Sequence, residues 1–281
     1  MRVSKPLIAL LVVGSAAAVI VPVRSLHSPK TSASPWETLE PGLELGELQA
    51  AHPSTSGDSK IRVLRIDPRL FELRLLNASA PGQGKPLTAR DWAHRNGLVA
   101  AVNASMYDAD HRTSMGMMLT GKHVNNPRLN RDKAVLAFDS RSPGIAPIKL
   151  IDRECDDLDA WKGHYGTLVQ SIRMISCKGE NVWAASDDPW SVAAIGVDHR
   201  GRVLFIHCRS PYTPHDLVEN LLSLPLDLAG AMYAEGGPEA QLYIRSGHRE
   251  IELVGSHGTS LFGSDRAWPV PNVIGIVRRK K

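Results

Sequence analysis

The sequence predicts an α+β fold: a mixed, largely antiparallel sheet core with two main helices in a single domain. Three observations support this. Short apolar or alternating runs recur through most of the chain, two segments carry helix-capping signals, and each capped segment is followed by an apolar strand. Because 43% of the residues are hydrophobic and 22% are charged, the chain has the composition of a globular protein.

The strand predictions begin with two alternating runs. Residues 61–66 and 70–76 alternate apolar and polar side chains, and Asp67-Pro68 separates them, so we expect a hairpin. Further strands are predicted at 98–103, 115–119, 134–139, 167–175, 192–197, 202–208 and 229–234.

The two helices are predicted from their ends. Thr88 is a capping residue for a helix that stops at Gly97. Thr213 caps a second helix that starts at Pro214 and runs through Leu222. Each helix leads into an apolar strand that ends in polar residues. Such strand ends are good candidates for a site, because the sheet holds them in place and loops open there.

The amino-terminal segment has the pattern of an export signal. Basic residues precede an apolar run at 7–23, and a Ser/Pro/Thr-rich stretch follows it. We expect residues 1–23 to be a signal peptide or an uncleaved membrane anchor, 24–38 a linker, and 39–281 the domain. Both alternatives place the domain outside the cytosol, in the periplasm or cell envelope, with membrane contact only through the first segment.

Charge and motifs narrow the function classes. The net charge is +4, partly from basic residues at the two ends, and no basic stripe is interleaved with aromatics, so no nucleic-acid partner is expected. The chain has no CxxC, HExxH, GxSxG, Walker or GxGxxG motif, so no metal or other cofactor is predicted. Three cysteines in an exported chain predict one disulfide and one remaining thiol, with the pairing open.

The segment 232–244 is the first candidate site. Glu235 and Glu239 flank Gly236 and Gly237 directly after a predicted buried strand. Glycoside cleavage commonly uses two carboxylates, and glycine amides can bind an anion. The alternative is a plain turn with solvated glutamates.

Other candidates suit a sugar phosphate. The amide of Asn103, at the end of the strand 98–103, can hydrogen-bond a sugar hydroxyl. Gln170 and Arg173 lie within an apolar strand, and Arg209 follows another, so the arginines are candidates for holding phosphate. For Arg173 the alternative is a structural ion pair.

Several segments in order resemble one known family, the phosphodiester glycosidases. The resemblance covers about residues 60–278. The family includes a lysosomal enzyme that removes N-acetylglucosamine from phosphate on mannose, and bacterial envelope proteins linked with exopolysaccharides. The segments that carry it are AAVNASMY (100–107), MGMMLTGKHV (115–124), VAAIGVDHRGRVLFIHC (192–208), AMYAEGGPEAQLYI (231–244) and WPVPNVIGI (268–276).

The resemblance implies a hydrolase that cleaves the glycosidic bond of a sugar-1-phosphodiester. Glu235 stands where the family's LDGGGS segment has its Asp, while Pro238 and Glu239 replace the third Gly and the Ser. We expect a carbohydrate or sugar-phosphate ligand. The alternatives are a non-catalytic module that binds glycan or anionic polymer and, more weakly supported, a metal-dependent hydrolase.

Overall fold

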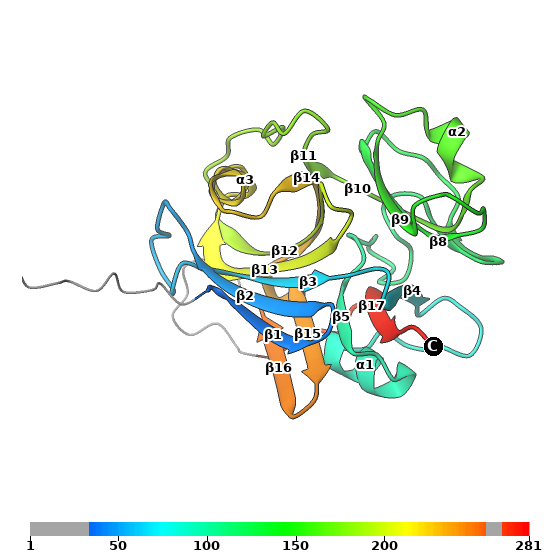
Figure 1. Ribbon diagram of the computed structural model, residues 1–281, viewed down its shortest axis with the longest axis horizontal. Helices are drawn as coiled ribbons and strands as arrows, with labels where there is room; N and C mark the ends of the chain where they lie inside the picture. Colours follow the sequence, from blue (N-terminus) through cyan, green and yellow to red (C-terminus); the bar gives the residue numbers. More distant parts are fainter. Residues whose placement is uncertain (1–33, 257–265, 281) are drawn as a thin grey trace, which may run out of the picture. The chain divides into compact units, whose positions relative to one another are not determined.

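The computed structural model describes residues 34–256 and 266–280, and Ser34–Lys281 belongs to one compact unit (Figure 1). The expected signal or anchor at 1–23 lies outside the described residues. Strand β1 begins at Trp36, before the expected start of the domain at residue 39. In the part of the chain that is described, no helix has the length and apolar character needed to cross a membrane.

A seven-stranded sheet carries one of the two candidate strand ends. Its strand order is β1-β2-β3-β13-β12-β14-β11, and every neighbouring pair is antiparallel. The strands are β1 (Trp36–Glu40), β2 (Leu43–Gln49), β3 (Lys60–Ile66), β11 (Arg173–Ile175), β12 (Trp190–Asp198), β13 (Val203–Tyr212) and β14 (Leu228–Gly236).

Two five-stranded sheets complete the fold. One has the order β7-β6-β10-β8-β9 and the other the order β16-β15-β5-β17-β4, again with antiparallel pairs. Their strands are β4 (Phe71–Asn77), β5 (Ala100–Asn103), β6 (Met118–Thr120), β7 (His123–Asn126), β8 (Ala134–Ser140), β9 (Ile148–Asp152), β10 (Tyr165–Ser171), β15 (Gln241–Ser246), β16 (Arg249–Val254) and β17 (Asn272–Arg278).

The α+β prediction is confirmed, and the described sheets are antiparallel throughout rather than mixed. The expected hairpin between the first two alternating runs is wrong. β3 pairs with β2 and β13, whereas β4 pairs with β17 in another sheet. The preceding strand β2 and the distant strand β13 fill the two edges of β3, so the short Asp67-Pro68 connection links two sheets instead of two paired strands.

The two predicted helices form with the expected caps. Thr88 accepts a hydrogen bond from the Asp91 N–H at the start of α1 (Ala89–Asn96), and Gly97 closes it in the left-handed conformation, with φ 62°. Thr213 caps α3 (Pro214–Ser223) in the same way. α1 leads into β5, and α3 leads into β14, as predicted. The sequence analysis missed α2 (Leu158–Lys162) and the 3₁₀ turn η1 (Gly237–Glu239).

The predicted strand 167–175 is divided between two sheets. β10 pairs with β6 and β8, and after Ile172 the chain continues as β11, which pairs with β14. The Ser171 hydroxyl donates to the Tyr233 carbonyl at 2.5 Å, and the Tyr233 N–H donates to the Ile172 carbonyl at 2.9 Å. These bonds join the two sheets two residues before Glu235.

The main core lies where the inner faces of the three sheets meet. It contains apolar residues from strands of all three sheets, including Leu64, Val102, Leu136, Ile195 and Ile274, each fully buried. Burial of this apolar surface is the main source of stability for the sheets. The core therefore fixes the positions of β5 and β14, from which the candidate site extends.

Candidate active site

The candidate site forms because the chain passes directly from β14 to the neighbour of β5. After Gly236 it turns through η1 into β15, and β15 pairs with β5 through Leu242 and Val102. The η1 turn therefore lies beside the end of β5. Gly237 supports the turn with φ +61°, a left-handed conformation that suits glycine.

Asn103 holds this turn in place. Its Nδ2 donates to the Glu239 carbonyl at 2.6 Å, and its Oδ1 accepts from the Gln241 N–H at 2.8 Å. The side chain is 2% exposed. The structure thus places Asn103 beside the η1 turn, with its amide bonded to the backbone of Glu239 and Gln241. The expected contact of the Asn103 amide with a sugar is corrected, because the amide is occupied by the protein backbone.

Glu235 is the most perturbed acid of the site. It is only partly exposed at the end of β14. Burial, and then the nearby negative charge of Glu239, raise the pKa of Glu235 to about 8, although the Gly236 N–H opposes the shift by donating to Oε1 at 3.2 Å. Glu235 therefore holds a proton at neutral pH, while its neighbourhood still opens to solvent.

Tyr107 completes a cluster with the two glutamates. It follows β5, beyond Asn103. Burial raises the pKa of the Tyr107 phenol above its ordinary value, and the charges of Glu239 and Glu235 and a hydrogen bond with Glu239 raise it further. A phenol that stays protonated beside two carboxyl groups is a fixed hydrogen-bond donor. The sequence analysis quoted Tyr107 within a motif but assigned it no role.

An aromatic wall adjoins Gly236. Trp190 Nε1 donates to Tyr233 Oη at 2.9 Å, and the rings of Trp183 and Tyr233 lie 5.2 Å apart between centroids. A Cβ atom at Gly236 would lie 2.2 Å from Tyr233 Oη and 2.6 Å from the Trp190 ring, so this position has no room for a side chain. The glycine was predicted as a site residue for its amide; the structure shows that it also lets these rings approach the backbone.

His207 supports the η1 turn from within the core. It is 1% exposed, and its Nε2 lies 3.2 Å from the Ala240 carbonyl, directly after η1. Burial lowers the pKa of His207 to about 4, so the ring is neutral at pH 7 and donates from Nε2. Its Nδ1 is buried and has no hydrogen-bond partner among the described residues.

Arg173 and Gln170 have other partners. Arg173 Nη1 lies 2.7 Å from Asp152 Oδ1, and Nη2 lies 2.8 Å from Glu154 Oε2. The amide of Gln170, which is fully buried, bonds the backbone of Asn130, Asp132 and Met117. The predicted roles of both residues in substrate binding are therefore corrected: the first forms a structural ion pair and the second supports a loop.

Arg209 lies closer to the site. Its Nη1 donates to the Val254 carbonyl at 3.3 Å, and its own carbonyl accepts a hydrogen bond from Ser191. Ser191 also holds the Ser256 N–H, and the Gly255 N–H donates to the Ala240 carbonyl after η1. Arg209 is thus an exposed cation beside the strands that enclose the turn.

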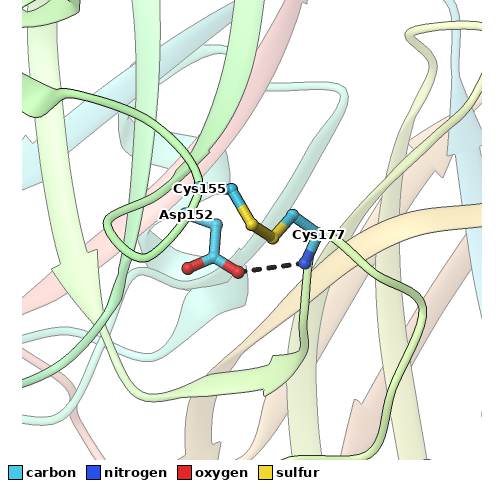
Figure 2. Close-up of side chains that lie close together, drawn as sticks. All are labelled: Asp152, Cys155 and Cys177. Carbon is cyan, nitrogen blue, oxygen red and sulfur yellow. Dashed lines mark hydrogen bonds between the residues drawn. A yellow bond between two sulfur atoms is a disulfide. The ribbon is translucent and has the colours of Figure 1, made fainter.

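A cluster of metal-ligand residue types lies near Arg173. Asp152, Cys155 and Cys177 bring an oxygen and two sulfur atoms together, and Asp152 also accepts a hydrogen bond from the Cys177 N–H (Figure 2). The two sulfurs are joined in a disulfide, which removes the thiolates that would bind a metal. Cys208 is the buried free thiol, so the expectation of one bridge and one remaining thiol is confirmed.

Fold and site together define a class: an antiparallel-sheet protein that brings two carboxyl groups and several aromatic side chains together around the end of β14. Paired carboxyl groups are common in enzymes that cleave glycosides. The family model for phosphodiester glycosidases matches residues 96–277. The chain belongs to the phosphodiester glycosidase family, and the resemblance seen in the sequence is confirmed.

Comparison with solved structures agrees on the fold. The catalytic domain of zebrafish N-acetylglucosamine-1-phosphodiester alpha-N-acetylglucosaminidase, auto-inhibited by its pro-peptide, has a TM-score of 0.58 at 14% identity, with 86% of each chain covered. A hypothetical protein from Synechocystis has a TM-score of 0.60 at 13% identity, covering 88% of this chain and 64% of its own. The comparison with curated proteins found no match.

Proposed function

We propose that this protein hydrolyses the glycosidic bond of a sugar-1-phosphodiester in an envelope glycan or glycoconjugate, after export from the cytosol. The observation that carries the proposal is the cluster of Glu235, Glu239 and Tyr107 at two strand ends within the family-matched range. The zebrafish relative's name gives N-acetylglucosamine-1-phosphodiesters as the first substrates to try.

The two glutamates have different roles in this proposal. A protonated Glu235 adds no negative charge, so an anionic phosphate diester can approach it, and its proton can pass to the leaving phosphate oxygen. Glu239 lies next to it on a turn held by Asn103. As the second carboxyl group, Glu239 assists attack at the anomeric carbon, the division of labour typical of glycosidases.

Isotope incorporation tests the proposal most sharply. Hydrolysis of an N-acetylglucosamine-1-phosphodiester in ¹⁸O-water should place ¹⁸O on the sugar, because the carbon–oxygen bond breaks. The phosphate monoester released should stay unlabelled. Label in the phosphate would indicate phosphodiesterase chemistry and would reject the glycosidase assignment.

A matched pair of variants assigns the activity to this site. Glu239→Gln should lower turnover by about 10²-fold or more. Glu180→Gln is the control, because Glu180 is exposed and its side chain forms no hydrogen bond or ion pair with the described residues. Equal turnover of the two variants would remove Glu239 from the mechanism.

The second candidate is a non-catalytic glycan-binding protein. The aromatic wall of Trp183, Trp190 and Tyr233 favours it, since aromatic rings are common in ligand sites. The altered segment, with Pro238 and Glu239 in place of Gly and Ser, also favours it. It predicts saturable glycan binding without release of sugar or phosphate monoester, so detection of either product would reject it.

A further inference from the structure

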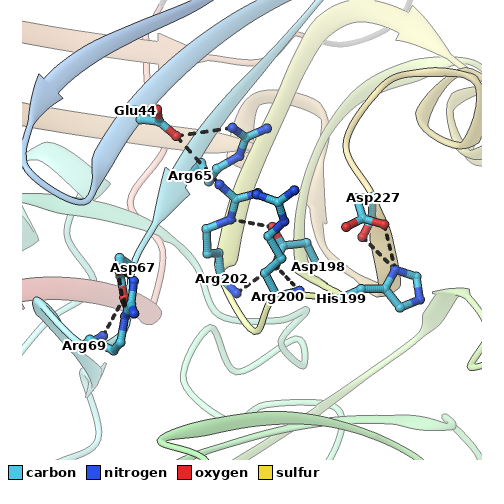
Figure 3. A network of polar contacts seen from close by, with 9 residues as sticks. All are labelled: Glu44, Arg65, Asp67, Arg69, Asp198, His199, Arg200, Arg202 and Asp227. Atoms are coloured by element: carbon cyan, nitrogen blue, oxygen red, sulfur yellow. Dashed lines mark hydrogen bonds and ion pairs between the residues drawn. The ribbon is translucent and has the colours of Figure 1, made fainter.

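A charged cavity lies at the opposite end of β12 from Glu235, Glu239 and Tyr107, which we call the carboxyl cluster. Its volume is about 670 Å³. One side is formed by arginines of β3 and of the β12–β13 turn, and the facing side by Ala146, Pro147 and Ile148 before and at the start of β9. We call it the arginine pocket; its charged lining residues are Glu44, Arg65, Asp67, Arg69, Arg200 and Arg202 (Figure 3).

The arginine pocket is separate from the carboxyl cluster. Ala193 is the residue of β12 opposite Glu235, and the strand ends five residues later at Asp198, next to the arginine-bearing turn. At roughly 3.3 Å per residue, this distance along the strand is about 17 Å. The inference that the arginine pocket binds a ligand is therefore independent of the function proposed above.

The acids of the arginine pocket do not balance its arginines. Four guanidinium groups face the two carboxylates of Glu44 and Asp67. Glu44 is shared, since its Oε2 lies 3.2 Å from Arg65 Nη1 and 3.9 Å from Arg202 Nη1. Even with the buried Asp198, whose carboxylate pairs with Arg202 at 2.7 Å, one positive charge is left over.

Arg200 carries that unmatched charge. Asp67 is engaged by Arg69 at 2.6 Å, and the side chain of Arg200 forms no hydrogen bond or ion pair with any described residue. Its backbone N–H is fixed by Asp198 at 3.0 Å. A guanidinium on a fixed turn with all its donors available can bind an anion.

Arg65 supplies a preorganised second cation. Its side chain is only 11% exposed, and its guanidinium stacks 3.4 Å from the centroid of the Trp36 ring. Its Nε is buried and has no hydrogen-bond partner in the described part of the chain. Burial, and then the charge of Arg202, lower the pKa of Arg65. Two guanidinium groups held this close repel each other, and an anion placed between them would remove that repulsion.

We propose that the arginine pocket binds a phosphorylated sugar. A phosphate group has three acceptor oxygens, enough to be shared by Arg65, Arg200 and Arg202, whereas a carboxylate has two. The volume is in the usual range for small-molecule sites and far exceeds what a phosphate alone would fill. The apolar wall at Pro147 and Ile148 would contact the sugar.

Calorimetric titration of the full-length protein tests this. Glucose 1-phosphate, inorganic phosphate and glucose are the probes. We expect glucose 1-phosphate to bind most tightly, inorganic phosphate more weakly, and glucose weakest. Equal affinity for the two phosphates would overturn the sugar part of the proposal, and no binding of either would overturn all of it.

Matched variants locate the binding. Arg200→Ala should weaken glucose 1-phosphate binding roughly tenfold or more through loss of charge-assisted hydrogen bonds. Arg131→Ala is the control, because Arg131 is also exposed and without a side-chain partner among the described residues. Unchanged affinity in Arg200→Ala, or an equal loss in Arg131→Ala, would overturn the site.

One further readout separates this proposal from the proposed function. Arg200→Ala should leave turnover of a sugar-1-phosphodiester unchanged, since the two sites lie at opposite ends of β12. If the protein has no turnover at all, the binding difference between the variants still stands as the test of the arginine pocket.

Discussion

Glu235 and Arg173 lie on neighbouring strands, yet they have opposite environments. Arg173 of β11 pairs with Met232 of β14, three residues before Glu235. Arg173 is bound by two carboxylates, so its charge is compensated. Among the described residues no cation bonds Glu235; its carboxyl accepts from the Gly236 N–H and experiences the negative charge of Glu239. A charge that is compensated within the protein supports structure, whereas an acid without a compensating cation keeps its proton to a higher pH and is available for chemistry.

The largest effect should come from the uncompensated acid. Glu235→Gln keeps the size of the side chain but removes the transferable proton, so kcat for a sugar-1-phosphodiester should fall by about 10²–10⁴-fold. The unfolding transition measured in parallel should remain cooperative. Turnover of Glu235→Gln within a factor of two of the native protein would mean that the Glu235 carboxyl, like the Arg173 ion pair, has no part in catalysis.

The compensated pair should matter for stability instead. Arg173→Met should lower the unfolding free energy by about 3–5 kcal/mol, because it leaves the carboxylate of Asp152, 8% exposed, without its cation. Urea denaturation measures this loss, and adding Asp152→Asn should recover part of it.

An exposed ion pair serves as the control for Arg173. Arg74→Met removes the partner of Glu72, a pair in which both side chains are about half exposed, and should cost less than about 1 kcal/mol. If Arg173→Met costs no more than Arg74→Met, the ion pair is not the structural element inferred here.

The pH dependence of stability should distinguish the two regions further. The pKa of Glu235 is raised to about 8, so the folded protein binds this proton more tightly than the unfolded chain. Its contribution is fully present below about pH 4.5 and is lost as pH rises towards 8. The native protein should therefore lose unfolding free energy from pH 5 to pH 9 that Glu235→Gln does not lose. The difference in unfolding free energy between the variant and the native protein should shift in favour of the variant by on the order of 2–4 kcal/mol. If urea denaturation gives the same difference in unfolding free energy between the two proteins at pH 5 and at pH 9, this prediction is contradicted.

Asp152 should show the opposite sign. Burial raises its pKa, but the hydrogen bonds from Arg173, Cys177 and Glu154 outweigh this and hold it below the ordinary value. Its contribution is present above the ordinary pKa and is lost as pH falls. The loss of unfolding free energy in Asp152→Asn relative to the native protein should thus be smaller at pH 3 than at pH 6.

The smallest predicted effect concerns Tyr107. Tyr107→Phe removes the hydroxyl that bonds Glu239 and leaves the ring, so turnover should fall about tenfold, in line with one hydrogen bond to a charged group. Tyr212→Phe is the control, since that hydroxyl bonds the His52 carbonyl. Equal activity of the two variants would place Tyr107 outside the catalytic cluster.

Much of this fold could be predicted from local signals. Thr88 and Thr213 mark helix starts through bonds to residues three positions on, and the strands after both helices follow from their apolar runs. The same logic found the strand end at Glu235. These features depend on neighbouring residues, which the sequence displays directly.

The rest depends on partners that are distant in the chain. Asp152, the partner of Arg173, lies 21 residues away, and β4 pairs with β17 near the carboxyl terminus. Neither pairing has a local pattern. The Trp190–Tyr233 contact that surrounds Gly236 is likewise set by strand register, so the aromatic wall could be recognised only in three dimensions.

The central claim is that Glu235 holds a proton at neutral pH. Carbon-13 NMR of protein labelled at the glutamate side-chain carboxyl tests it, with the Glu235 signal assigned from its absence in Glu235→Gln. The account predicts one glutamate that titrates near pH 8. A Glu235 signal that titrates near 4.5, the ordinary value for a glutamate side chain, would contradict it.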